Sequence, residues 1–310
     1  MNYTEIIKRI EESKDLPVVN REINEIMVML NDSESLNIEE LAEKISKCGN
    51  LKETLLVNIN SGYFKLARRV ESLSDAIIYL GMMTVEKLII AYLIKSLFPD
   101  NLGKPTKLSR DKYWKHCLGT SIAANILAEK LGKQDNYRYF AYGLIHDIGV
   151  MVIDVCLPDV IDEVVKMQYK GIHQIVAERL IMQGYTHTHA GALLCEKWNL
   201  PNDVKAIIEH HHTPLMADGY LEDVIIMNVA DSISTLYYER LLCMNTNYVF
   251  DKKAMEVLGI SMQDIESISE VLPQKVDEVS KQLGWQPLEN CNPLPQFGHM
   301  LLSSNSLSQK

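Results

Sequence analysis

Gly143-Leu144-Ile145-His146-Asp147-Ile148-Gly149 is the stretch that indicates both the fold and the site. It closes a helical pattern with an apolar run, and we predict one helix from Asn136 to Ile148. Neighbouring side chains on a helix lie about 100° apart, so His146 and Asp147 can face one cleft near the end of this helix. Imidazole and carboxylate together are suitable ligands for Zn, Mn or Fe. Two ligands do not complete a metal site, so the rest of the chain must supply more.

Further histidines and one carboxylate lie on both sides of this pair. His116 precedes it within an apolar helical pattern, and His189, the run His210-His211-His212 and Asp231 follow it. Each of these residues alone favours a structural role, because buried polar groups are usually satisfied by hydrogen bonds and histidines at a helix end interact favourably with its dipole. Together they predict one metal site assembled from several helices.

At two places in this series, several histidines lie close together in the sequence and only some of them can be ligands. His187 and His189 diverge by about 200° on a helix, so at most one of them can face a given ion. We expect His189 to face inward, because Gly184 precedes it and Ala190-Gly191 would permit a close neighbour. In the run His210-His211-His212 we expect two ligands, with the third histidine outside.

The flanking sequence predicts an all-α protein with two lobes. Helical spacing recurs throughout, and up to residue 103 no stretch alternates long enough to form a sheet. Pro, Gly and Asn cluster at 98–105 and mark a linker. We therefore expect an N-terminal helical bundle over 1–103 and a second helical domain over 104–245, followed by a helical extension over 246–310 with a loose tail at 303–310.

Composition excludes several classes of protein. The chain has 310 residues and a formal net charge of −10, which argues against general nucleic-acid binding. Its six cysteines form no C-x-x-C pair, as in a reducing compartment. The N-terminus does not resemble a signal peptide, and the apolar run at 88–94 is too short to span a bilayer. We expect a cytoplasmic protein without membrane contact.

The order His, His-Asp, His, His-His, Asp on a helical chain resembles the HD superfamily of metal-dependent phosphohydrolases. Several segments narrow the resemblance to the HDOD family, the HD-related output domain of bacterial signalling proteins. These segments are Leu16-Pro17, Asn37-Ile38-Glu39-Glu40-Leu41-Ala42, Asn60-Ser61-Gly62-Tyr63-Phe64, 74–81, 189–194, Trp198-Asn199-Leu200-Pro201 and His211-His212-Thr213-Pro214. The resemblance covers roughly 10–240 and implies a two-lobed all-helical fold.

The resemblance also implies a ligand set of seven residues and one or two divalent ions (Fe, Mn, Zn or Ni). A four-ligand HD site would use His116, His146, Asp147 and Asp231, and a second ion would add His189 with His211 and His212. Asp147 would then be the catalytic candidate, because it would bridge the two ions that share a hydroxide. The chain departs from the HD-GYP phosphodiesterases at Val150, where they have lysine, and at Thr213-Pro214-Leu215, where they have Gly-Tyr-Pro.

These features leave two interpretations open. In the first, the protein regulates signalling by binding a partner protein or a nucleotide messenger, and metal or the bare cluster holds its helices together. In the second, it is a metal-dependent phosphohydrolase acting on a nucleotide or cyclic dinucleotide. An enzyme would need a cation to stabilise the transition state, and Arg138 and Lys115 are placed for this only by their position in the sequence. The near-complete ligand set favours the enzyme, while the missing lysine and Gly-Tyr-Pro favour the binding protein.

Overall fold

The computed structural model describes residues 3–32, 36–242 and 250–283, and every regular element in these ranges is a helix. The prediction of an all-α fold is confirmed. The predicted tail at 303–310 lies outside the described residues. Cytoplasmic location stays a prediction: 137–156 has the length and hydropathy of a membrane span, but residues 139–156 are all buried inside the protein.

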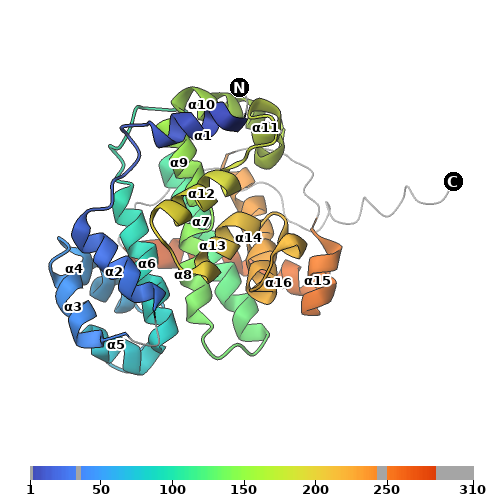
Figure 1. The fold of residues 1–310 in the computed structure, drawn as a ribbon. Coiled ribbons are helices and arrows are strands. Elements are labelled where there is room, and N and C mark those ends of the chain that lie inside the picture. Colours follow the sequence, from blue (N-terminus) through green and yellow to red (C-terminus); the bar gives the residue numbers. More distant parts are fainter. Residues whose placement is uncertain (1–2, 33–35, 243–249, 284–310) are drawn as a thin grey trace.

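The N-terminal bundle occupies one side of the molecule (Figure 1). Asn37 caps one of its helices, because its side-chain oxygen accepts hydrogen bonds from the backbone of Glu39 and Glu40 at 3.0 and 3.1 Å. Ser72 caps the helix that begins at Leu73. The bundle comprises α2 (Arg21–Asn31), α3 (Ile38–Ser46), α4 (Leu51–Ile59), α5 (Leu73–Leu80) and α6 (Met82–Leu97).

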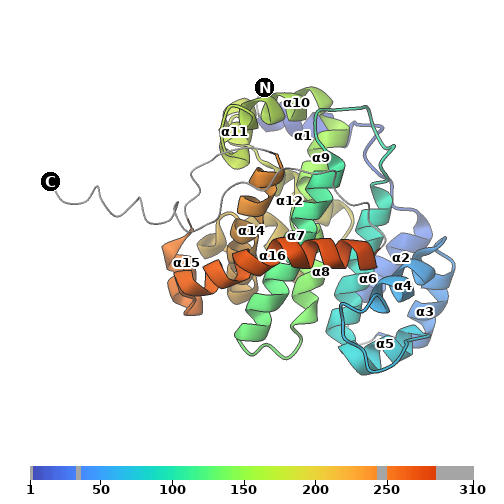
Figure 2. The same cartoon turned by 180° about the vertical axis from the view of Figure 1, so that it is seen from behind.

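A second group of helices forms the centre of the protein. The long helix α7 packs against α8, α14 and α16, and α9 packs against α12. Figure 2 shows α16 crossing the back of this group. The central helices are α7 (Arg110–Lys130), α8 (Tyr137–Ile145), α9 (Ile148–Cys156), α12 (His187–Lys197), α13 (Asn202–His210), the short 3₁₀ helix η1 (Pro214–Met216), α14 (Leu221–Leu241), α15 (Lys252–Leu258) and α16 (Met262–Gln282).

Three helices cover one end of the central group: α1 (Tyr3–Glu11), α10 (Pro158–Gln168) and α11 (Gln174–Ile181) (Figure 1). Although α1 precedes the N-terminal bundle in sequence, it packs on α9. Arg9 also makes a two-point ion pair with Asp159 of α10, at 2.5 and 3.2 Å. The expected division at residue 103 stays a prediction, but α1 lies with the second lobe.

The predicted helix from Asn136 to Ile148 is divided in the structure. α8 ends at Ile145, and α9 begins at Ile148 and continues to Cys156. Gly149, which resembles a helix stop in the sequence, lies inside α9. It is required there by contact with α12, because a Cβ at this position would lie 1.8 Å from the carbonyl oxygen of His187 and 2.7 Å from the backbone nitrogen of Gly191.

Candidate metal centre

The junction of α8 and α9 places His146 and Asp147 in the core. His146 is the residue that caps α8, and its Nδ1 lies 2.9 Å from the carbonyl oxygen of Gly143. Because a carbonyl can only accept a hydrogen bond, Nδ1 carries the proton and Nε2 keeps its lone pair. Nε2 is therefore the atom that His146 can offer to a metal.

A first group of ligand atoms joins three helices. His116 from α7, His146 from the end of α8 and Asp231 from α14 have ligand atoms within 4.8 Å of one another. Asp231 Oδ1 lies 3.2 Å from Nε2 of His116 and 3.4 Å from Nε2 of His146. Two imidazoles and one carboxylate thus surround one point.

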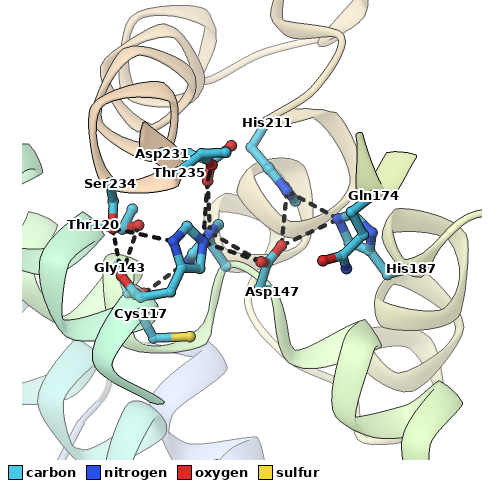
Figure 3. Close-up of polar contacts among 12 residues, drawn as sticks. Cys117, Thr120, Gly143, Asp147, Gln174, His187, His211, Asp231, Ser234 and Thr235 are labelled. Atoms are coloured by element: carbon cyan, nitrogen blue, oxygen red, sulfur yellow. Dashed lines mark hydrogen bonds and ion pairs between the residues drawn. The ribbon is translucent and has the colours of Figure 1, made fainter. Parts of the chain in front are cut away.

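A second group lies on the other side of Asp147. It contains Asp147, His187, His211 and His212, again with ligand atoms within 4.8 Å of one another. Asp147 Oδ1 lies 3.1 Å from Nε2 of His187 and 3.2 Å from Nε2 of His211. Figure 3 shows Asp147 between Asp231 on one side and His187 with His211 on the other.

Asp147 connects the two groups through its two oxygens. While Oδ1 faces the second group, Oδ2 lies 3.3 Å from Nε2 of His116 and 3.5 Å from Nε2 of His146. His212 also approaches both groups, because its Nδ1 lies 3.7 Å from Asp231 Oδ2. A carboxylate in this position is suited to bridge two cations.

The structure places six of the seven predicted ligands together and moves the seventh away. His189 does not face the cluster, contrary to expectation: its Nδ1 lies 2.8 Å from Thr186 Oγ1, and its ring stacks on Tyr185. His187 takes the inward position. The reason is the helix start, since Thr186 caps α12 and its capping box uses His189 as the third helical residue. Of the three consecutive histidines, His210 is the one that lies outside the cluster.

Glu178 is a buried residue of α11 that sequence spacing did not reveal. Its Oε2 accepts hydrogen bonds from His187 Nδ1 at 2.7 Å and from the His187 backbone nitrogen at 2.9 Å. The carboxylate holds the proton on Nδ1, so Nε2 of His187 points at Asp147. Burial alone would lower the pKa of His187, but Glu178 and Asp147 raise it well above its usual range, so a metal ion at Nε2 would replace a proton there. The one available sequence signal was an acidic residue in a helix whose other described buried residue is Ala177.

Charge in the cluster is balanced between carboxylates and imidazoles. Burial alone would raise the pKa of Asp147, but the surrounding histidines hold it well below its usual range. Burial alone would lower the pKa of His116, but Asp147 and Asp231 raise it to about 9. Burial lowers the pKa of His211. Burial alone would raise the pKa of Asp231 as well, but His116 and His146 hold it well below its usual range. Both carboxylates are therefore ionised, and His211 is neutral, which is the form that binds metal.

The donor atoms fit a metal ion. His146 Nε2, Asp147 Oδ1 and Asp231 Oδ2 are buried and make no hydrogen bond. Such atoms destabilise a fold unless a partner compensates for the lost water. A divalent cation in each group would satisfy all three atoms, and the nitrogen and oxygen set suits Zn, Mn, Fe or Ni.

The two expected cations do not lie in this cluster. Arg138 pairs with Asp223 at 3.1 Å, at the start of α14. Lys115 is buried, and the carboxylates that act on its ammonium group are Asp277 and Asp111. Neither side chain offers a positive charge to a substrate at the ligand atoms.

Three comparisons relate this chain to known proteins. Over 212 residues it is 26% identical to an uncharacterized protein of Treponema pallidum (strain Nichols), a match that covers 67% of this chain and 39% of the length of that relative. A crystal structure of a candidate phosphohydrolase from Shewanella amazonensis SB2B has a TM-score of 0.66 at 22% identity, covering 90% of this chain and 97% of that one. A candidate signal transduction protein from Marinobacter aquaeolei VT8 has a TM-score of 0.67 at 18% identity, covering 91% of this chain and 64% of that one.

These structural likenesses establish the fold. The family is established by the sequence itself, because residues 16–214 match the model of the HDOD domain. That range includes the N-terminal bundle and every proposed ligand except Asp231. This protein belongs to the HDOD family.

Proposed function

We propose that the protein is a signalling HDOD protein whose HD site binds two divalent metal ions through a shared Asp147. The observation that carries this proposal is the position of the Asp147 carboxylate, which directs one oxygen to each group of histidines. One ion would be held by His116, His146, Asp147 and Asp231. The other would be held by Asp147, His187, His211 and His212.

Burial of the ligands supports binding as the main role. The side chains of His146 and His211 are fully buried, and that of Asp231 is 2% exposed. The more exposed ligands are His212, at 15%, and Asp147, at 9%, so little ligand surface faces a phosphate ester. Ions enclosed in this way would hold six helices together, so metal occupancy would control the stability and shape of the surface offered to a partner protein or nucleotide messenger.

A metal-dependent phosphohydrolase is the second candidate function, and the bridging position of Asp147 favours it. Two bound ions would polarise a phosphoryl oxygen and lower the pKa of water. The chain's own residues would fix the geometry: Asp147 would set the spacing of the ions, and the histidines would hold each ion in place. The similarity in fold to the Shewanella protein, which is described as a candidate phosphohydrolase, is compatible with this function.

The test is elemental analysis of protein purified without a metal-affinity tag. We expect about two equivalents of metal in the wild type, as in two-metal sites. His146→Ala should lose the ion of the first group, and Asp147→Ala should lose both. The wild type would next be screened with cyclic dinucleotides and phosphomonoesters, where turnover that depends on Asp147 would establish the enzyme. A wild type without metal would refute both functions.

A further inference from the structure

A buried ion pair joins the N-terminal bundle to the lobe that carries the metal centre. Lys87 of α6 places its Nζ 2.7 Å from Oδ2 of Asp203, in the first turn of α13. Their side chains are only 7% and 11% exposed. α6 lies beside α8 in both views of the fold (Figures 1 and 2). Among the described residues, the packing of α6 on α8 is the main contact between the two lobes.

The same carboxylate extends the pair to α8. The hydroxyl of Tyr142 donates a hydrogen bond of 2.6 Å to Asp203 Oδ2, and this side chain is also buried. Tyr142 precedes the proposed ligand His146 by one turn, and its carbonyl oxygen accepts from the backbone nitrogen of His146 at 2.9 Å. Asp203 lies at the opposite end of α13 from His211, whose backbone nitrogen donates to Ile207. Lys87 is thus linked through α8 to His146 of the first group and through α13 to His211 of the second group.

A second cation, Arg138, links α14, another helix that carries a proposed ligand, to the contact between the two lobes. Arg138, in the first turn of α8, pairs with Asp223 in the first turn of α14, the helix that carries Asp231. Its other guanidinium nitrogen lies 3.8 Å from the sulfur of Met83 in α6. The three ligand-bearing helices α8, α13 and α14 therefore contact α6 directly or through Arg138. They do so at the ends that lie away from the metal centre.

Stability alone does not account for a buried ion pair at this position. Removing two charges from water is costly, and apolar residues of similar volume often stabilise a protein as well or better. The pair instead fixes the relative positions of three helices, because the ammonium group belongs to α6, the carboxylate to α13 and the hydroxyl to α8. A shift of α6 by even a fraction of a hydrogen-bond length must be followed by α13 and α8 or break these contacts.

We propose that the Lys87–Asp203–Tyr142 contact couples the metal centre to the N-terminal bundle, so that metal occupancy is reported at the bundle surface. This inference rests on the proposed metal-binding function and concerns its regulation. Coupling of this kind is reciprocal. Metal must rigidify α6, and loss of the Lys87 contact must weaken metal binding, although none of the three residues is a ligand.

The test uses the full-length protein and two measurements. The first is metal affinity, by competition with a chromophoric chelator. The second is hydrogen exchange of the α6 backbone with and without metal. We expect Lys87→Met to weaken metal binding by about tenfold, within the usual 5–150-fold range of coupling between sites. Metal should slow exchange in α6 of the wild type and have little effect in the variant.

Two further variants separate coupling from a general loss of stability. Lys130→Met removes an ion pair of the same length, 2.7 Å to Asp264, whose lysine is half exposed, and should leave both measurements unchanged. Lys87→Met with Asp203→Leu removes both charges and should fold stably, yet still bind metal more weakly. Unchanged affinity and unchanged α6 protection in this double variant, with a wild type that binds metal, would overturn the coupling alone. A wild type that binds no metal would overturn the coupling together with the proposed function.

Discussion

Glu178 holds His187 at two points, through the ring Nδ1 at 2.7 Å and through the backbone nitrogen at 2.9 Å. Backbone and side chain of the same residue are therefore fixed by one carboxylate from another helix. Together with the Thr186 cap of α12, which engages His189, this double contact keeps His187 facing Asp147.

Replacement of Glu178 by glutamine tests this orientation. The amide oxygen can still accept both hydrogen bonds, but it carries no negative charge, so it holds the Nδ1 proton of His187 less strongly. We expect metal affinity to fall by about 10–100-fold, the usual effect of losing a partner of a metal-binding histidine. Glu163→Gln, which removes an exposed carboxylate paired with Lys166, is the control and should bind metal like the wild type. Equal affinities in the two variants would contradict the role of Glu178.

The choice between the two neighbouring histidines can be tested directly. His187→Ala removes a ligand of the second group, so we expect the metal content to fall by one equivalent in elemental analysis. His189→Ala removes a ring that bonds Thr186 and stacks on Tyr185, so the metal content should not change. Loss of metal in His189→Ala alone would show that His189 is the ligand.

Metal removal should destabilise the protein without any change of sequence. A ligand that binds only the folded state contributes about 2.7 kcal/mol when its free concentration is one hundred times the dissociation constant. We expect a chelator to lower Tm and the free energy of unfolding by an amount of this order, and added metal to restore both. Asp147→Asn should show no response to the chelator, because its bridging carboxylate is lost. A wild type whose Tm ignores the chelator would argue against metal in the folded core.

Glu86 should make stability depend on pH. Its side chain is buried in α6 with Oε1 lacking a hydrogen bond, and burial raises its pKa, partly offset by Lys87. The folded state therefore binds the proton of Glu86 more tightly than the unfolded state does. This contribution to the stability of the fold is complete below the ordinary pKa of 4.5, and it is lost as pH rises through the higher pKa of the folded state. Glu86→Gln should therefore be more stable than the wild type at pH 8, by about 1 kcal/mol, and equal to it near pH 4. Denaturant unfolding at the two pH values measures the difference, and a constant difference would exclude this titration as its cause.

Much of the site could be predicted from the sequence. His116, His146, Asp147 and Asp231 lie at positions where a polar residue interrupts an apolar helical face, and such interruptions need a partner. The choice of His187 over His189 could not be made this way. It depends on which residue caps α12, and that is settled by three-dimensional contacts around Thr186.

Other features arise only from packing between distant segments. Glu178 belongs to α11, and its partner belongs to α12, so spacing along one helix gives no signal. Gly149 resembles a helix stop until the backbone of α12 is known to lie against it. The position of α1 beside α9 likewise depends on contacts across more than 140 residues of chain, such as the pair of Arg9 with Asp159.

The contact of Gly149 with Gly191 has a consequence for how this protein can diverge. At this crossing main chain meets main chain, and a Cβ at Gly149 would lie 2.7 Å from the Gly191 nitrogen. The separation of Asp147 from His187 is therefore set by peptide atoms that flank both residues. Mutations elsewhere on α9 and α12 can exchange one apolar side chain for another while this spacing is inherited unchanged. The contact of the two glycines therefore keeps the distance between these two ligands constant, while related chains can vary their surfaces and partners.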